Sequence, residues 1–127
     1  MSYERCDIVI AADPFRDSDR GRPFVIINTD ETPFHGEQYI ALALTTRTWH
    51  DERISLGDDD WDDGAAPARS SIMPWSITSV KHKWIDTYQG RLRSKVVDRA
   101  ATALIGWIRP SEASRCSGAR LSDVSDE

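Results

Sequence analysis

The sequence predicts a mainly β protein with α structure: a small, strongly bent sheet or barrel with one C-terminal helix packed against it. Strand-like apolar runs follow one another in quick succession over residues 7–85, and one helical stripe follows over residues 94–108. The length of 127 residues suits a single domain with a real core, expected over residues 1–109. Residues 110–127 are rich in serine and lack apolar periodicity, so we expect a disordered tail.

Four strands are expected in the first half of the chain. Residues 7–12 are β-branched, and residues 23–28 begin with a proline where a missing N–H does least harm. Residues 38–45 are apolar on both faces for most of their length, which favours a central place in the sheet. Residues 52–56 are expected to form a short edge strand before an acidic loop that runs to Pro67.

The second half is expected to hold a bent extended region and then the helix. Residues 71–73 and 75–85 read as extended with Pro74 between them, and their irregular alternation predicts a bulge or strong bend. Ser94 is expected to cap the helix, and Pro110 to end it. One stripe of apolar side chains, its tryptophan included, is expected to face the core: Val97, Ala100, Ala101, Leu104, Trp107 and Ile108.

The net charge of −5 conceals a division along the chain. Residues 51–63 carry a net charge of −6, whereas residues 64–109 carry +6. This segregation keeps a nucleic-acid partner open despite the acidic total. Three interpretations of the acidic segment stay open: a solvated, partly disordered loop, which is favoured, an adaptation to a high-salt cytoplasm, or a nucleic-acid mimic that folds over a basic groove.

Composition argues against a membrane span and a secreted disulfide framework. The longest apolar runs fall far short of the roughly 20 residues that a membrane helix needs. No secretory apolar region follows the N-terminus. The two cysteines, Cys6 and Cys116, sit near opposite ends of the chain, so a reducing cytoplasm is expected.

Metal and cofactor motifs are not expected. The acidic run invites a calcium-loop reading, but the loop positions that need glycine and glutamate hold Asp63 and Arg69. The histidines His35, His50 and His82 are scattered without ligand spacing. We therefore expect neither a metal nor a cofactor.

Two places concentrate groups that suit a phosphate. The polar loop over residues 13–22 supplies donors, and the strand ending at Thr45 continues into Thr46 and Arg47. If residues 23–28 and 38–45 pair as antiparallel neighbours, Arg22 meets Thr45. A guanidinium beside hydroxyl donors binds phosphate without a metal. The alternative is a loop arginine paired with an aspartate, and threonines that simply favour a strand.

The basic residues of the second half and the tryptophans each have two interpretations. A basic face formed by Lys81, His82 and Lys83 with later arginines either contacts RNA phosphates or is a solvated rim. Trp84 is expected in the core, as is Trp107 in the predicted helix. The other three, Trp49, Trp61 and Trp75, lie in or beside loops, where they either cap the ends of the barrel or stack on bases.

The order of these features resembles the PemK/MazF family of toxin endoribonucleases over residues 5–108. The resemblance is carried by DIV at residues 7–9, RGRP at residues 20–23, LTT at residues 44–46, SIMPWSITSV at residues 71–80 and GRL at residues 90–92. It implies an SH3-like, plasmid-maintenance-toxin barrel that forms a homodimer. It also implies the toxin of a toxin–antitoxin pair, cleaving single-stranded RNA in the cytoplasm without metal and blocked by an antitoxin protein.

Transferred onto matching positions, the resemblance makes Arg22 and Thr45 the catalytic residues. The arginine would stabilise charge on the reacting phosphate, and the hydroxyl would bond a non-bridging oxygen. The general base is not visible in the sequence. The donors around this pair and on the basic face are expected to bind RNA: Arg16, Arg20, Thr46, Arg47, Lys81 and Lys83.

Two positions depart from the family pattern. Cys6 stands where the family has a glycine before the acidic residue of its first strand, and Trp75-Ser76 replaces an acidic-Gln pair that shapes the groove. The second departure supports an alternative, a catalytically silent barrel of the same family that binds RNA or a protein partner. A toxin acting on a protein target such as a topoisomerase has no support beyond shape.

Overall fold

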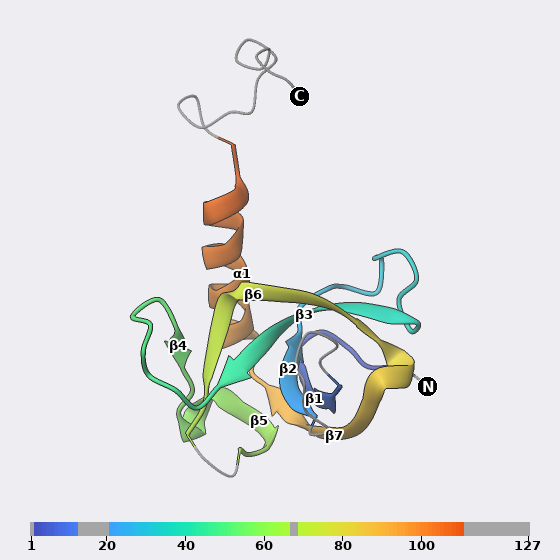
Figure 1. The fold of residues 1–127 in the computed structure, drawn as a ribbon, viewed down its shortest axis with the longest axis horizontal. Coiled ribbons are helices and arrows are strands. Elements are labelled where there is room, and N and C mark those ends of the chain that lie inside the picture. The colour runs from blue at the N-terminus through green and yellow to red at the C-terminus, as the bar shows by residue number, and fades with distance from the viewer. Residues whose placement is uncertain (1, 13–20, 67–68, 111–127) are drawn as a thin grey trace.

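A computed structural model describes residues 2–12, 21–66 and 69–110, and it confirms the mainly β fold with one C-terminal helix (Figure 1). Its seven strands form one antiparallel, curled sheet in the order β4-β6-β3-β2-β1-β7-β5. The strands are β1 (Asp7–Ala11), β2 (Arg22–Ile26), β3 (Gln38–Thr45), β4 (Ile54–Ser55), β5 (Trp61–Gly64), β6 (Ser71–Lys81) and β7 (Ile85–Leu92). Short 3₁₀ helices cover Asp58–Asp60 and His82–Trp84, and α1 covers Ser94–Ile108.

The sheet buries side chains on both of its faces, which explains why β3 is apolar almost throughout. Leu42 on β3 joins the cluster that packs against α1, whereas Ala41 and Ala43 join a second cluster on the other face. Alternate residues of a strand point to opposite faces, so one strand serves both clusters. The predicted central place of this strand is confirmed, since β3 lies between β2 and β6.

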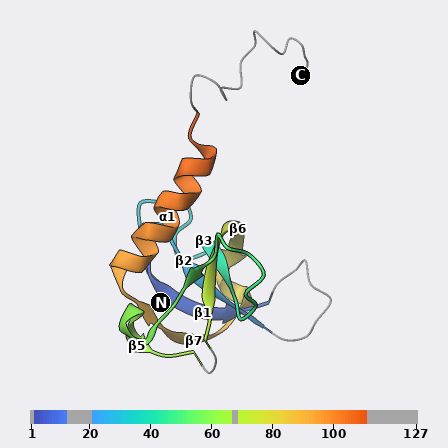
Figure 2. The same ribbon diagram turned by 90° about the vertical axis from the view of Figure 1, so that its left-hand side faces the viewer.

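The C-terminal end of α1 does not pack on the sheet. Val96, Val97 and Ala100 are buried and Leu104 packs against the same core cluster, while the last turn of the helix projects beyond the barrel (Figure 2). Trp107 is 52% exposed, so its predicted place in the core is wrong: the apolar stripe continues past the end of the sheet. The residue before the helix is Arg93, and it makes no side-chain cap, so the predicted cap by Ser94 is also wrong. The predicted tail lies outside the described residues except for Pro110.

The acidic segment is more ordered than its composition predicts. Instead of a disordered loop, it forms a 3₁₀ turn and then β5, which pairs with β7 as an edge strand. The side chain of Asp60 accepts a hydrogen bond from the backbone N–H of Gly57 (2.8 Å), and Trp61 packs against the core. The absence of a side chain on Gly90 allows β5 and β7 to approach closely at Gly64. A Cβ on Gly90 would lie 2.5 Å from the Asp63 carbonyl oxygen.

A tyrosine fastens the acidic strand and gives a pH-dependent contribution to stability. The Tyr88 hydroxyl donates to Asp63 Oδ2 (2.8 Å), and burial together with this bond raises the pKa of Tyr88 to about 12 from 10.0. The folded state therefore holds this proton more tightly than the unfolded chain. We expect the contribution to be intact below about pH 10 and lost as the pH rises towards about 12.

Urea unfolding of wild type and Tyr88→Phe across this pH range tests the contribution. The stability difference in favour of wild type should shrink with rising pH, since the variant has no phenol to ionise at this position. A difference that stays constant from pH 9 to pH 12 would contradict it.

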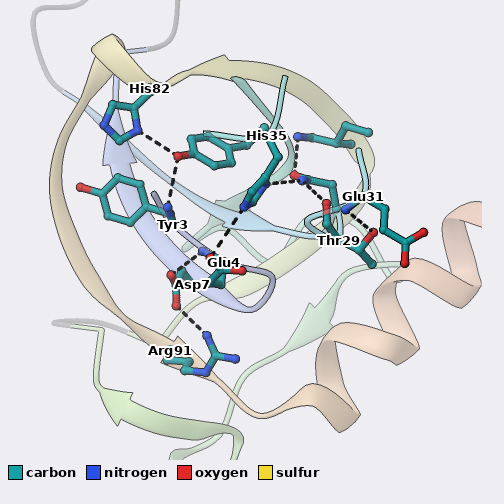
Figure 3. Close-up of polar contacts among 11 residues, drawn as sticks. Tyr3, Glu4, Asp7, Thr29, Glu31, His35, His82 and Arg91 are labelled. Carbon is teal, nitrogen blue, oxygen red and sulfur yellow. Dashed lines mark hydrogen bonds and ion pairs between the residues drawn. The ribbon is translucent and has the colours of Figure 1, made fainter. Parts of the chain in front are cut away.

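The N-terminal segment closes one end of the barrel through a polar network (Figure 3). The buried Tyr39 hydroxyl accepts the backbone N–H of Tyr3 (3.1 Å) and contacts His82 Nδ1 (2.9 Å). Arg91 Nη1 donates to Asp7 Oδ1 (2.8 Å), which joins β7 to the start of β1. Within the described part of the chain, none of the helices has the length and apolar character needed to cross a membrane.

Candidate functional site

A cleft of about 570 Å³ opens where β2 begins and β3 ends. The turn after β3 and the first residues of β6 complete its walls. The described residues that line it are Gly21, Arg22, Pro23, Leu44, Thr45, Thr46, Arg47, Trp49, His50, Arg53, Ser70, Met73 and Trp75.

Antiparallel pairing of β2 with β3 brings Arg22 and Thr45 to the same end of the sheet. Phe24 faces Ala43 in the ladder, and two residues further out the strands end at Arg22 and Thr45. The half-buried guanidinium of Arg22 donates from Nη2 to the Leu44 carbonyl oxygen at 3.5 Å, a long bond. The juxtaposition is the one expected from the short connection between these strands.

The strand-end threonine is held by the turn that follows it. Thr45 Oγ1 accepts a hydrogen bond from the backbone N–H of Arg47 (3.1 Å), a local turn typical of threonine. A hydroxyl that accepts one bond keeps its own proton for donation. Thr45 can therefore donate to an oxygen of a ligand in the cleft, with the exposed Thr46 beside it.

The cleft is strongly electropositive. Arg22, Arg47 and Arg53 line it, and none of the described lining residues carries a carboxylate. Arg53 donates from Nη1 to the His50 carbonyl oxygen (2.8 Å), while its Nε is buried without a hydrogen-bond partner among the described residues. Guanidinium groups present planar donors that match a phosphate, so the lining suits a phosphodiester.

Two tryptophans form the aromatic part of the cleft. Trp49 is 73% exposed, and the Arg47 guanidinium carbon lies 4.4 Å from its ring centroid. Trp75 meets the ring of His50 edge to face, with centroids 5.1 Å apart and planes at 74°. An exposed aromatic ring beside arginines is typical of a surface on which unpaired bases stack.

A bulge in β6 brings Trp75 to the cleft. Leu42 faces Ile77 and Leu44 faces Ile72, so residues 73–76 of β6 lie opposite Ala43 alone. Extra residues in one strand bend it and change the direction of its side chains. The predicted irregularity around Pro74 is confirmed, although β6 is one continuous strand.

The other predicted RNA-binding residues do not join this cleft. Arg16 and Arg20 lie outside the described residues. Lys81 pairs with Gln38 at the opposite end of β3 from Thr45, about 20 Å along the strand. There Lys81 and Lys83 line a separate groove with His82 and the exposed Phe34.

The acidic segment does not cover the cleft, and two lining residues carry no motif that marks them as functional. None of residues 58–63 is among the described lining residues, so the structure does not place this segment over the groove as a mimic. The histidine spacing bears on His50 only as a metal ligand, and no sequence pattern marks Arg53. Their nearness in sequence to Thr45 is the signal by which they could be found.

Within the described ranges, no three His, Cys, Asp or Glu side chains gather as metal ligands would.

The fold is similar to the folds of two solved endoribonucleases and one solved toxin. One is an endoribonuclease in complex with its cognate antitoxin from a mycobacterial species (TM-score 0.63, 16% identity, covering 83% of this chain and 91% of that chain). Another is an endoribonuclease from a mycobacterial species (TM-score 0.63, 18% identity, covering 84% and 90%). A third is the Mycobacterium tuberculosis toxin MazF-mt6 (TM-score 0.57, 16% identity, covering 79% and 92%). At these identities the likeness establishes the fold.

The sequence itself decides the family. No curated protein matches it. A family model does, described as PemK-like, MazF-like toxin of type II toxin-antitoxin system, over residues 4–108. This match covers all seven described strands and α1. The chain therefore belongs to the PemK-like, MazF-like toxin family of type II toxin–antitoxin systems.

Proposed function

We propose that the protein is a metal-independent endoribonuclease that cleaves single-stranded RNA in the arginine-lined cleft. The observation that carries this proposal is the meeting of Arg22 and Thr45 at one end of the sheet, in a cleft whose described lining bears three arginines. Membership of a toxin family, and likeness in fold to solved endoribonucleases, support the same assignment.

The chemistry needs positioning and charge stabilisation more than a protein nucleophile. The RNA 2′-oxygen attacks the adjacent phosphorus, the bond from phosphorus to the 5′-oxygen breaks, and a 2′,3′-cyclic phosphate and a 5′-hydroxyl result. Arg22 stabilises the negative charge that develops on the phosphate oxygens, and Thr45 donates to a non-bridging oxygen. Thr46 and Arg47 bind the neighbouring backbone.

The open, aromatic lining favours unpaired RNA. Trp49 presents most of its ring to solvent, and a base freed from pairing can stack on it. A duplex keeps its bases stacked inside and cannot use such a surface. Lys81 and Lys83, at the far end of β3, contact RNA only where the strand extends well beyond the cleft.

The partners follow the family. We propose an antitoxin protein that blocks the cleft, and a homodimer in the cytoplasm, where the RNA substrate is found. Support for a protein contact comes from the projecting end of α1, where Ile105 is 44% exposed, Trp107 52% and Ile108 68%. Large apolar side chains gathered at one exposed helix end are typical of association surfaces.

Incubation of the purified protein with mixed-sequence single-stranded RNA in EDTA tests the function. We expect short products with 2′,3′-cyclic phosphate ends, and no cleavage of an oligonucleotide whose 2′-hydroxyls are replaced by hydrogen. Salt-sensitive binding without products would instead assign the protein to the RNA-binding alternative. Absence of both binding and cleavage, in protein freed of antitoxin, would refute the proposal.

A further inference from the structure

The proposed reaction needs a group that accepts the proton of the attacking 2′-hydroxyl. Arginine is a poor base because its guanidinium stays protonated at all ordinary pH values, and threonine does not ionise there. Histidine is the side chain that exchanges a proton near neutral pH. Among the described residues that line the cleft, His50 is the one of this type.

The turn after β3 holds this histidine in the cleft. Arg53 donates to the His50 carbonyl oxygen from its backbone N–H (3.3 Å) and from Nη1 (2.8 Å), which fixes the backbone of the turn. His50 is exposed, so its ring is accessible to a ligand. The backbone is thus anchored, and His50 lines the same cleft as Arg22 and Thr45.

The bulged strand β6 supplies the surface that orients the imidazole. The Trp75 ring meets it edge to face at 5.1 Å, a geometry that aromatic pairs prefer. Trp75 is the first residue of the pair that departs from the resemblance described above. In this chain the departure places an aromatic ring against the imidazole of His50.

The charges around the ring are those of a phosphate site. The turn and β2 contribute Arg47, Arg53 and Arg22 to the cleft, while residues 73–76 of β6 carry no charge. The carboxylates nearest in sequence, Asp51 and Glu52, are exposed on the same turn and are not among the described lining residues. A phosphodiester drawn to the arginines therefore arrives beside the imidazole.

We infer that His50 is the general base of the cleavage step, with Trp75 as its positioning residue; this rests on the proposed function. The neutral imidazole takes the proton of the 2′-hydroxyl as the bond from the 2′-oxygen to phosphorus forms. The bond from phosphorus to the 5′-oxygen breaks, and the 5′-oxygen takes a proton from water. The imidazolium then returns its proton to the solvent, which restores the starting state.

The decisive experiment compares the pH dependence of kcat for wild type, His50→Gln and His50→Ala on one cleavable single-stranded RNA in EDTA. A base must be unprotonated to accept a proton, so wild-type kcat should rise with pH. Both variants should lose about 10²- to 10⁴-fold in kcat and should lose this rise with pH, with KM little changed. Added imidazole should restore part of the activity to His50→Ala and none to Arg22→Ala.

Two further variants separate positioning from general damage. Trp75→Phe keeps an aromatic edge and should retain most of the wild-type kcat, whereas Trp75→Ala should lose about 10-fold with a shifted pH profile. Glu52→Gln, an exposed change on the same turn, should leave kcat and the profile unchanged. Thermal unfolding of every variant shows that the fold is retained.

The outcomes distinguish this inference from the function on which it rests. If wild type cleaves and His50→Gln keeps its kcat and pH profile, His50 is not the base, while the endoribonuclease assignment stands. If wild type cleaves no RNA, the proposed function fails and the role of His50 fails with it.

Discussion

Replacement of Arg22 by alanine should lower kcat for RNA cleavage by about 10²- to 10³-fold, because it removes a donor that stabilises charge in the transition state. The guanidinium reaches the cleft from the first residue of β2, beside the strand end that carries Thr45. Single-turnover cleavage with enzyme in excess measures the effect free of product release. Activity within three-fold of wild type would place the chemistry elsewhere.

Arg22→Lys is the matched control for charge. Lysine keeps the positive charge but lacks the planar fork that binds two phosphate oxygens at once. We expect this variant to retain RNA binding better than Arg22→Ala while recovering only a minor part of kcat. Because Arg22 is half-buried and bonded to the Leu44 carbonyl, melting temperatures of both variants must accompany the rates.

Gly90→Ala should destabilise the fold by about 2–3 kcal/mol, since overpacking against backbone cannot relax easily. The added Cβ would lie 2.5 Å from the Asp63 carbonyl oxygen, 2.9 Å from the Trp61 ring and 3.2 Å from Gly64 Cα. Either β5 separates from β7 or both strands distort. Calorimetry should show a melting temperature lower by roughly 10 °C.

Gly106→Ala makes the same chemical change where there is room. No atom of the described residues lies within 4 Å of a Cβ at this exposed position in the last turns of α1. Alanine favours a helix over glycine by about 0.5–1 kcal/mol, so this variant should be slightly more stable. Equal melting temperatures for the two alanine variants would contradict the close contact between β5 and β7.

Much of the sheet, and the juxtaposition of Arg22 with Thr45, could be predicted from local patterns. Short, largely apolar runs rich in β-branched residues predict β1, β2 and β3, and antiparallel pairing of β2 with β3 brings Arg22 to Thr45. The strands at residues 61–64 and 85–92 are harder to predict, because their many polar side chains give no clear apolar pattern. Their pairing also depends on contacts distant in sequence. The glycine contact that joins β5 to β7 has no local signature.

The helix and the cleft show where local reasoning ends. The apolar stripe of α1 correctly indicates a helix. Trp107 is nevertheless exposed, because the sheet does not extend beneath the end of the helix. Likewise, His50 and Trp75 are 25 residues apart in sequence and meet only because a bulge directs Trp75 to the cleft. Such pairs are properties of the tertiary structure.

Cys6 stands where the resemblance has glycine, and its backbone and its side chain place opposite requirements on the residue at this position. Its φ of 84° lies in the left-handed region that favours glycine, yet its side chain is buried in the core cluster. Its N–H and carbonyl bond to Ile26 and Leu92, which tie it to two strands. Glycine at this position would relieve the backbone but leave a void in the core, whereas a larger side chain would have to fit both a left-handed backbone and a closely packed interior. We therefore expect this position to accept only small side chains.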